Sequence, residues 1–214
     1  MNLEILHVGQ LGTNCYVTWD EDGNCAVIDC GGDPDKVASY LKEHNLTPLC
    51  LLLTHGHGDH MGGVADLKAL YPDARISLHR GDEPMVNDGE KNMGNHVAPG
   101  WKPITVDQWV KEGDVIPCGS MNFTVLETPG HTDGGVTYVQ GNKMYCGDTL
   151  FQGSMGRTDL YGGNNDKMAA SLKRLSQIEG YYVVLPGHGP ASNLEDERRS
   201  NPYMRRAAQD KPLF

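Results

Sequence analysis

Short hydrophobic runs recur along the chain, and most of them are closed by Gly, Pro, Asp or Asn. Runs of this kind, rich in aliphatic and aromatic residues and bounded by turn-forming residues, predict β-strands. The predicted strands are Leu3–His7, Asn14–Thr18, Cys25–Asp29, Leu49–Leu53, Arg75–Leu78, Phe123–Glu127, Val136–Val139, Met144–Cys146 and Tyr182–Leu185.

Between and after these strands, other segments have the periodicity of amphipathic helices. Asp33 and Pro34 are expected to cap and begin the first helix, Gly180 to end the third, and Ser192 with Glu195 to form a capping box for the last. Strands that follow one another early, and helices that separate later strands, predict a mixed α/β domain. The helical faces are Val37, Leu41 and His44, then Met61, Val64, Leu67 and Leu70, and then Met168, Leu172, Leu175 and Ile178.

The segment Gly81–Gly113 has little periodicity and is rich in Gly, Pro and Asn. A long irregular segment in a compact domain is often a functional flap. A surface excursion with its own small core, built on Met93, Trp101 and Trp109, is an equal alternative.

Size and composition exclude several classes of protein. With 214 residues, the chain is expected to form one domain, 1–214, with a substantial core. Its net charge of −10 argues against nucleic-acid binding. The longest apolar run, Leu49–Leu53, is too short to cross a membrane, and the N-terminus does not resemble a signal peptide. Six cysteines without a Cys-x-x-Cys pair indicate buried free thiols in a reducing cytoplasm.

The strongest chemical signal is the run Thr54–His60, in which three histidines surround Asp59. It directly follows Leu49–Leu53, whose continuous apolar character is typical of a buried strand. The polar residues are therefore expected at the C-terminal edge of a sheet, where ligands bind in open α/β folds. A merely exposed His-rich loop is the weaker interpretation.

Three more predicted strands end in the same way, with glycine and then a residue that can bind a metal. They lead to His131, Asp148 and His188. One tetrahedral ion needs only about three protein ligands, so a larger set of imidazoles and carboxylates predicts two ions that share one carboxylate. The candidate ligands are His55, His57, Asp59, His60, His131, Asp148 and His188.

Two divalent ions in such a site would lower the pKa of a bound water to about 7 and polarise a carbonyl group. After the two carboxylates and a bridging hydroxide are counted, the site keeps a small positive charge, which favours an anionic or carbonyl-bearing substrate. The chemistry predicted is metal-dependent hydrolysis.

These motifs resemble those of the metallo-β-lactamase-fold superfamily, and within it the short, bacterial-type glyoxalase II-like branch of hydroxyacylglutathione hydrolases. The similarity runs from about Cys15 to Pro202, nearly the whole chain. It rests on His-x-His-x-Asp-His at 55–60, Gly-His-Thr at 130–132, Gly-Asp-Thr-Leu-Phe at 147–151 and Gly-His-Gly at 187–189.

The resemblance implies a four-layer αββα sandwich with the metals at one sheet edge. It implies one ion held by His55, His57 and His131, and a second held by Asp59, His60 and His188. Asp148 would bridge the two ions, and Asp59 would also act in catalysis by orienting the nucleophilic hydroxide.

Further residues are weaker candidates. Asp29 matches a family aspartate beside the site, where it would support the ligands, although an aspartate before two glycines can simply form a turn. Arg157 lies in a Gly-Arg-Thr-Asp stretch and could bind a substrate carboxylate, or else form an internal salt bridge with Asp159 or Asp166. Tyr161 is a candidate for the same pocket. A second stretch, Glu197–Pro202, also resembles this branch.

The function implied is hydrolysis of a small anionic thioester such as S-D-lactoylglutathione by a hydroxide bridging two divalent ions. Zinc is expected, and iron or manganese would also suit these ligands. Only 26 residues follow His188, so no C-terminal glutathione-binding helical domain is expected, and Asp133 stands where relatives often have Pro.

Alternatives remain open. An iron-dependent persulfide dioxygenase can share this fold, although that class tends to have Cys where Gly135 stands here. Hydrolysis of another ester or a lactone, β-lactamase activity and a non-catalytic metal-binding module are further readings. Oligomeric state is not predicted. His7, His44 and His79 are expected to be structural, whereas His96 could reach a substrate from the segment 81–113.

Overall fold

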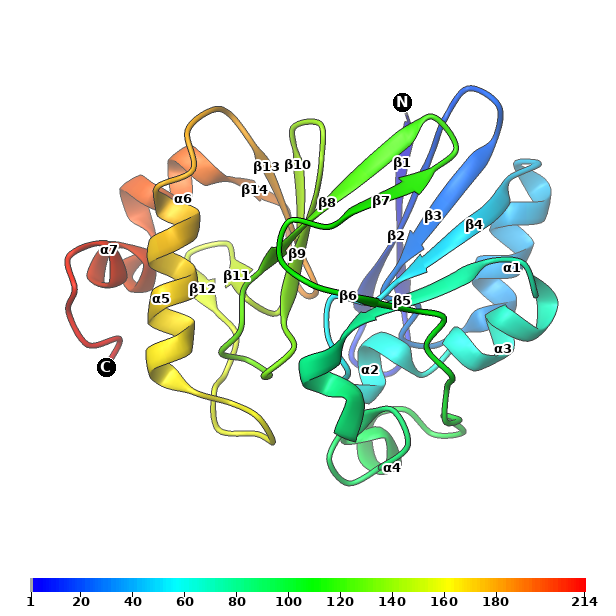
Figure 1. Ribbon diagram of the computed structural model, residues 1–214, viewed down its shortest axis with the longest axis horizontal. Helices are drawn as coiled ribbons and strands as arrows, with labels where there is room; N and C mark the ends of the chain where they lie inside the picture. The colour runs from blue at the N-terminus through cyan, green and yellow to red at the C-terminus, as the bar shows by residue number, and fades with distance from the viewer. Residues whose placement is uncertain (1) are drawn as a thin grey trace.

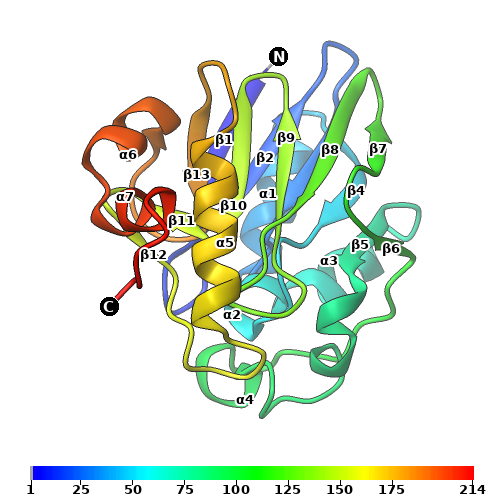
Figure 2. The same cartoon turned by 60° about the vertical axis from the view of Figure 1, so that its left-hand side comes forward.

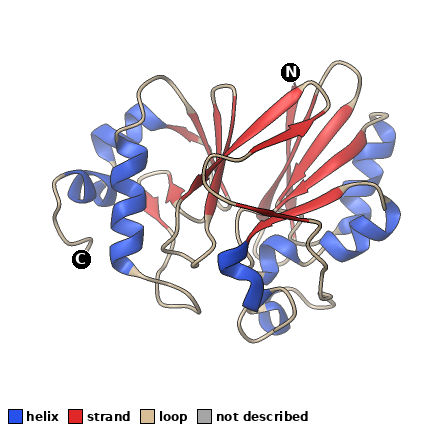
Figure 3. Ribbon diagram, viewed as in Figure 1, coloured by secondary structure: helices blue, strands red, loops and turns tan. Residues whose placement is uncertain are grey.

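Two six-stranded sheets lie face to face in the computed structural model, which describes residues 2–214, and helices cover their outer faces (Figures 1 and 3). One buried hydrophobic cluster lies between the two sheets. A second lies between the first sheet and its helices, and a third lies between the second sheet and its helices. Three apolar layers separate four layers of secondary structure. The predicted α/β class and αββα sandwich are therefore confirmed.

The first sheet has the order β1-β2-β3-β4-β5-β6. Its strands β1, β2 and β3 are antiparallel neighbours, and the remaining pairs are parallel. Two helices, α1 (Pro34–Glu43) and α3 (Val64–Leu70), pack outside it. The strands are β1 (Asn2–Val8), β2 (Thr13–Trp19), β3 (Asn24–Ile28), β4 (Thr47–Leu52), β5 (Arg75–His79) and β6 (Gln108–Val110).

The second sheet has the order β14-β13-β10-β9-β8-β7, and only β10 and β13 are parallel neighbours. Figure 2 shows α5 (Asn165–Ser176) in front of this sheet, with α6 (Leu194–Ser200) and α7 (Pro202–Ala208) beside it. A small hairpin of β11 (Leu150–Phe151) and β12 (Ser154–Met155) follows β10. The strands are β7 (Val115–Cys118), β8 (Met121–Glu127), β9 (Val136–Gln140), β10 (Lys143–Gly147), β13 (Val183–Pro186) and β14 (Ser192–Asn193).

Both faces of the central strands are buried, which explains why their sequences are continuously apolar. In β4, for example, Leu51 faces the helices of the first sheet, whereas Cys50 and Leu52 face the second sheet. All six cysteines are buried and free, as predicted. None of the helices within residues 2–214 has the length and apolar character needed to span a bilayer.

Every predicted strand is present, but two helix boundaries and one helix-capping contact were wrong. Asn193, not Ser192, caps α6, because its side chain accepts from the Asp196 amide. Asp33 does precede α1, yet its carboxylate accepts from the Gly9 amide instead of capping the helix. Helix α5 ends at Ser176, before Gly180.

The face predicted from Met61 to Leu70 belongs to two helices, α2 (Gly58–Met61) and α3. The break comes at Gly62–Gly63, where the Gly63 amide donates to the Cys30 carbonyl oxygen at 2.9 Å. The chain thus turns at the point where it meets the loop after β3.

The segment 81–113 is neither a single loop nor a separate core. It contains most of a 3-10 helix, η1 (Arg80–Met85), then α4 (Gly94–Val97) and the edge strand β6. Val86 and Ile104 belong to the core under the first sheet, and Trp101 and Trp109 pack against it. The segment is therefore part of the main fold.

Candidate metal centre

The seven predicted ligands follow the C-terminal ends of four strands, at one edge of the sandwich. His55, His57, Asp59 and His60 come after β4 of the first sheet. The other three come after β8, β10 and β13 of the second sheet, which run in the same direction because β9 is antiparallel to β8 and β10. In Figure 1 this edge is the lower one, where α2 lies below the strands of the first sheet.

Their donor atoms form two compact groups that match the predicted division, and a third group, of His55, His60 and Asp148, overlaps both. His55, His57 and His131 offer atoms that lie within 4.8 Å of one another, and so do Asp59, His60 and His188. In the first group, His57 Nδ1 lies 2.9 Å from His131 Nε2. In the second, His188 Nε2 lies 3.1 Å from Asp59 Oδ2 and 3.3 Å from His60 Nε2. Each group contains side chains from both sheets.

Asp148 lies between the two groups. Its Oδ2 is 3.5 Å from His131 Nε2 and 3.7 Å from His188 Nε2, and its Oδ1 is 3.3 Å from His60 Nε2. A carboxylate whose oxygens lie near both groups can bind both of two neighbouring ions. This position agrees with the shared ligand that the sequence predicts.

The protonation of the histidines suits metal binding. Thr54 Oγ1 donates to Asp29, so His55 Nδ1–H donates to Thr54 Oγ1 at 3.1 Å and leaves Nε2 as a lone-pair donor. His55 Nε2 is buried and has no hydrogen-bond partner within residues 2–214. A buried nitrogen lone pair of this kind, in a set of imidazoles and carboxylates, suits a divalent ion. The residues present therefore fit the binuclear site.

Asp29 lies beside the centre, in the turn after β3. It is buried, with φ at 58°, and its Oδ1 accepts from the Thr54 amide at 2.8 Å. Its Oδ2 accepts from Thr54 Oγ1 at 2.7 Å and lies 2.9 Å from His60 Nδ1. Asp29 thus both forms a turn and contacts a predicted ligand.

The hairpin β11–β12 supports His131 from the other side. His131 Nδ1 donates to the Arg157 carbonyl oxygen at 2.7 Å. Gly156 is needed for this approach, because a Cβ there would lie 1.8 Å from the Asp148 carbonyl oxygen. Asn201 Nδ2 donates to the carbonyl oxygens of Phe151 and Ser154, which ties the Glu197–Pro202 stretch to this hairpin.

Burial and neighbouring charges lower the pKa values of His55 and His57 and raise those of His60 and His188. Burial and the neighbouring imidazoles lower the pKa of His57 to about 3 and that of His55 well below its usual value. Burial opposes protonation of His60 as well, but Asp148, Asp59 and Asp29 outweigh it and raise the pKa of His60. Burial opposes ionisation of Asp148, but the attraction of His60 outweighs the effect of burial and lowers the pKa of the Asp148 carboxyl group.

A cavity of about 180 Å³ opens beside the centre. Its wall includes four aliphatic side chains, from the β1–β2 turn, the segment around α4 and the loop after β12. Arg157 is the cation in the wall, and its guanidinium group pairs with both oxygens of Asp159, at 2.6 and 2.7 Å. The aliphatic residues are Leu11, Met93, Val97 and Leu160.

Several weaker candidates lie outside this wall. Tyr161 does not line the cavity, and Lys91 Nζ lies 5.4 Å from the centre of its ring. His96 forms an exposed pair with Glu90 at 3.1 Å. His44 stacks on Tyr40, and His79 Nε2 lies 3.1 Å from Glu127 Oε1, as suits structural histidines.

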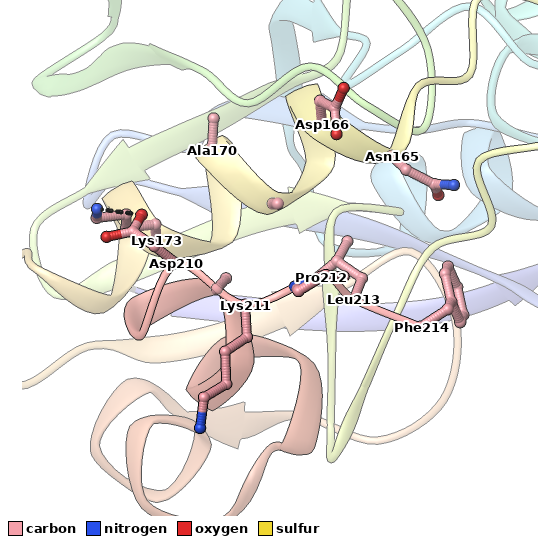
Figure 4. A pocket seen from close by; sticks show the side chains of 11 residues that line it. Asn165, Asp166, Ala170, Lys173, Asp210, Lys211, Pro212, Leu213 and Phe214 are labelled. Atoms are coloured by element: carbon pink, nitrogen blue, oxygen red, sulfur yellow. Dashed lines mark hydrogen bonds and ion pairs between the residues drawn. The ribbon is translucent and has the colours of Figure 1, made fainter.

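A larger groove, of about 730 Å³, lies away from the centre, between α5 and the C-terminal tail (Figure 4). The Lys173–Asp210 pair, at 2.6 Å, lies at one end of it, and Leu213 and Phe214 line it from the C-terminal tail. None of the seven predicted ligands lines this groove. Size alone therefore does not identify the functional site.

Sequence reasoning missed two polar residues next to the ligands, Asp82 and Asn92. Both are fully buried, and they contact the loop 54–60 through its backbone. Asp82 had a usable signal, because a glycine followed by an aspartate comes at the end of β5, at Gly81-Asp82, as it does at the end of β10, at Gly147-Asp148. Asn92 had none, since its contact with this loop is made by its own carbonyl oxygen.

Comparisons with known proteins agree with the observed fold. A family model described as the metallo-beta-lactamase superfamily matches residues 8–188. The hydroxyacylglutathione hydrolase GloC of Haemophilus influenzae is 31% identical over 208 residues, which cover 95% of this chain and 98% of GloC.

Two solved structures are similar over almost the whole chain. The B3 metallo-beta-lactamase BLEG-1 is 31% identical with a TM-score of 0.87, covering 95% of this chain and 99% of its own. TTHA1623, in a di-iron-bound form, is 35% identical with a TM-score of 0.83, covering 94% and 99%. These matches confirm the resemblance that the motifs indicated: the chain belongs to the metallo-beta-lactamase superfamily.

Proposed function

We propose that this chain is a binuclear metal-dependent hydrolase that cleaves small anionic thioesters, with S-D-lactoylglutathione as the first candidate substrate. The observation that carries the proposal is the position of Asp148 between two three-residue donor groups. The similarity to GloC supports the thioester class.

In this proposal His55, His57 and His131 hold one ion, Asp59, His60 and His188 hold the other, and Asp148 contacts both. Divalent ions bound there would supply a water of lowered pKa and polarise the scissile carbonyl. The low pKa values of His55 and His57 leave their ring nitrogens neutral and ready to bind at neutral pH.

Asp59 has a further proposed role in catalysis. It lines the cavity as well as contacting His188. Burial opposes its ionisation, but His60 and His188 together lower its pKa, so its carboxylate is ionised at neutral pH. It can therefore accept a hydrogen bond from the attacking water and hold that water towards the substrate.

The cavity wall suggests how the substrate is oriented. Leu11, Met93 and Leu160 can cover the aliphatic part of a thioester and exclude bulk water. Arg157 can bind a carboxylate of the substrate if that group replaces Asp159. Replacement is feasible because both side chains are more than half exposed, at 62% and 66%, and exposed ion pairs are weak.

A thioester suits this site for a chemical reason as well. The leaving thiolate belongs to a thiol with a pKa of about 8.5, so it departs without needing a proton donor. We propose zinc as the metal, although the histidine and carboxylate donors also suit iron or manganese, and TTHA1623 was crystallised with iron. The buried free cysteines support a cytoplasmic location.

The test is metal analysis of freshly purified protein together with hydrolysis of S-D-lactoylglutathione. We expect two ions per chain and thioesterase activity that is lost on chelation and restored by zinc. An Asp133→Asn variant is a matched control, because Asp133 pairs with Lys167 at the surface and should leave both readouts unchanged.

Two outcomes would overturn the proposal. Because BLEG-1 is a β-lactamase, nitrocefin is assayed in parallel, and turnover as fast as that of the thioester would favour β-lactam hydrolysis. Oxygen uptake by iron-loaded protein with glutathione persulfide, in the absence of thioesterase activity, would favour a dioxygenase.

A further inference from the structure

The five histidines of the centre differ in how their rings are oriented. The outward nitrogens of three of them have partners: Thr54 for His55, Asp29 for His60 and the Arg157 carbonyl for His131. His188 is partly exposed, at 27%. His57 is different, because its Nδ1 faces His131 while its buried Nε2 has no partner within the described chain.

The backbone on each side of His57 is held instead. The Gly56 amide donates to Asp82 Oδ2 at 2.8 Å, and the Gly58 amide donates to the Asn92 carbonyl oxygen at 2.7 Å. Both acceptors belong to the segment between β5 and α4. The side chain of Asn92 fixes that segment in turn, since its Nδ2 donates to the Met85 carbonyl oxygen at 2.7 Å.

Asp82 also holds the loop that carries His131. Its Oδ2 accepts from Thr132 Oγ1 at 2.8 Å, and its Oδ1 accepts from the Gly134 amide at 2.7 Å. The approach is close, because a Cβ on Gly134 would lie 2.6 Å from the Asp82 amide nitrogen. One carboxylate thus joins the loops on which His57 and His131 stand.

We propose that Asp82 is a positioning residue that sets the distance between His57 and His131, and thereby the affinity of the His55–His57–His131 group for its ion. Asp82 touches neither ring, so it acts only through the loops. The Asp59–His60–His188 group is supported by Asp29 and is independent of Asp82. This inference rests on the proposed binuclear site, but not on the identity of the substrate.

Variants that keep only one of the two donor groups intact make the test specific. A His188→Ala variant keeps the His55–His57–His131 group intact, and a His131→Ala variant keeps the Asp59–His60–His188 group intact. Asp82→Asn preserves the size of the side chain but replaces one acceptor oxygen with an amide donor. It is introduced into both backgrounds, and each apoprotein is titrated with Co²⁺ and followed by visible absorption.

We expect Asp82→Asn to weaken Co²⁺ binding about 10- to 100-fold in the His188→Ala background, the range seen when residues that support metal ligands are changed. Binding in the His131→Ala background should not change. Asp20→Asn is the matched control, because Asp20 is also buried and accepts from the Ser120 and Asn24 amides, but at the other end of β2. It should alter neither affinity.

Equal weakening in both backgrounds, or no change in either, would overturn the inference. If Asp82→Asn does not fold, Thr132→Val removes one of the three donors and should give a smaller shift confined to the same background. Failure of the unmodified protein to bind two ions would instead contradict the proposed function, so the two failures can be told apart.

Discussion

Asp29 and Asp82 are both buried carboxylates beside the predicted ligands, but they hold those ligands in different ways. Asp29 lies 2.9 Å from a ring nitrogen of His60, whereas Asp82 contacts two backbone amides and a hydroxyl group and no ring. A carboxylate on a ring fixes its tautomer as well as its direction. A carboxylate on two loops fixes only the spacing of whatever those loops carry.

The largest effect on metal binding and activity is expected at Asp148, which lies between the two donor groups. Asp148→Ala should remove both ions, because this carboxylate is shared. Thioesterase activity should fall by more than the loss of about 10- to 100-fold that is typical when a residue supporting a metal ligand is changed. Metal content and turnover are measured on the same sample. A variant that kept two ions and its full rate would contradict the shared-ligand interpretation.

The next largest effect is expected at Asp29, which supports the Asp59–His60–His188 group. Asp29→Asn in the His131→Ala background should weaken metal binding about 10- to 100-fold, because His60 loses the acceptor that fixes its tautomer. This substitution should weaken binding more in the His131→Ala background than in the His188→Ala background, the reverse of Asp82→Asn. If Asp29→Asn instead weakened the His55–His57–His131 group more strongly, Thr54 would be the main route of its influence.

A change of pH should separate the two groups by a smaller amount. Carboxylates outweigh burial and raise the pKa of His60, whereas burial lowers the pKa of His55 and His57. A raised pKa means that an ion must displace a proton at neutral pH, so affinity falls as the pH is lowered. Between about pH 8 and 6, binding should weaken more in the His131→Ala background than in the His188→Ala background.

Titrations at both pH values in one buffer series check this expectation, and proton release measured in weakly buffered solution provides a second readout. The same pH dependence in both backgrounds would show that the carboxylates do not distinguish the groups.

The smallest effect concerns the side chain of Arg157, whose carbonyl supports His131 whatever the side chain does. Asp159→Asn should free the guanidinium group and lower KM for an anionic thioester a few-fold, about the effect expected of an exposed pair. The kcat and the metal content should not change. An unchanged KM, with Asp133→Asn as control, would leave Arg157 as a surface ion pair.

The strands and the ligands could be predicted because both depend on local pattern. Buried strands such as β4 are continuously apolar, and His131, Asp148 and His188 each follow a recognisable strand and a glycine. Short edge strands such as β6 and β14 were missed because two or three residues carry no period. The cap of α6 was misplaced by one residue because Ser192 and Asn193 are both good N-caps.

The residues that hold the ligands in place were harder to predict than the ligands themselves. The position of Asp82 after β5 was a usable signal that it lies near the site. The backbone amides that Asp82 and Asn92 contact could not be identified from the sequence. The pairing of Arg157 could be narrowed to two carboxylates, and only the structure selects Asp159 over Asp166. Local pattern identifies which residues can act, whereas tertiary contacts decide how they are held.

Each donor group combines residues from both sheets: His55 and His57 with His131, and Asp59 and His60 with His188. Every ion bound as proposed would therefore fasten one half of the sandwich to the other. Binding only to the folded state adds about 2.7 kcal/mol of stability when the free ion is at 100 times its Kd. Scarcity of metal in the cell would then shorten the lifetime of this protein, by exposing loosened chains to proteases, as well as silencing its chemistry.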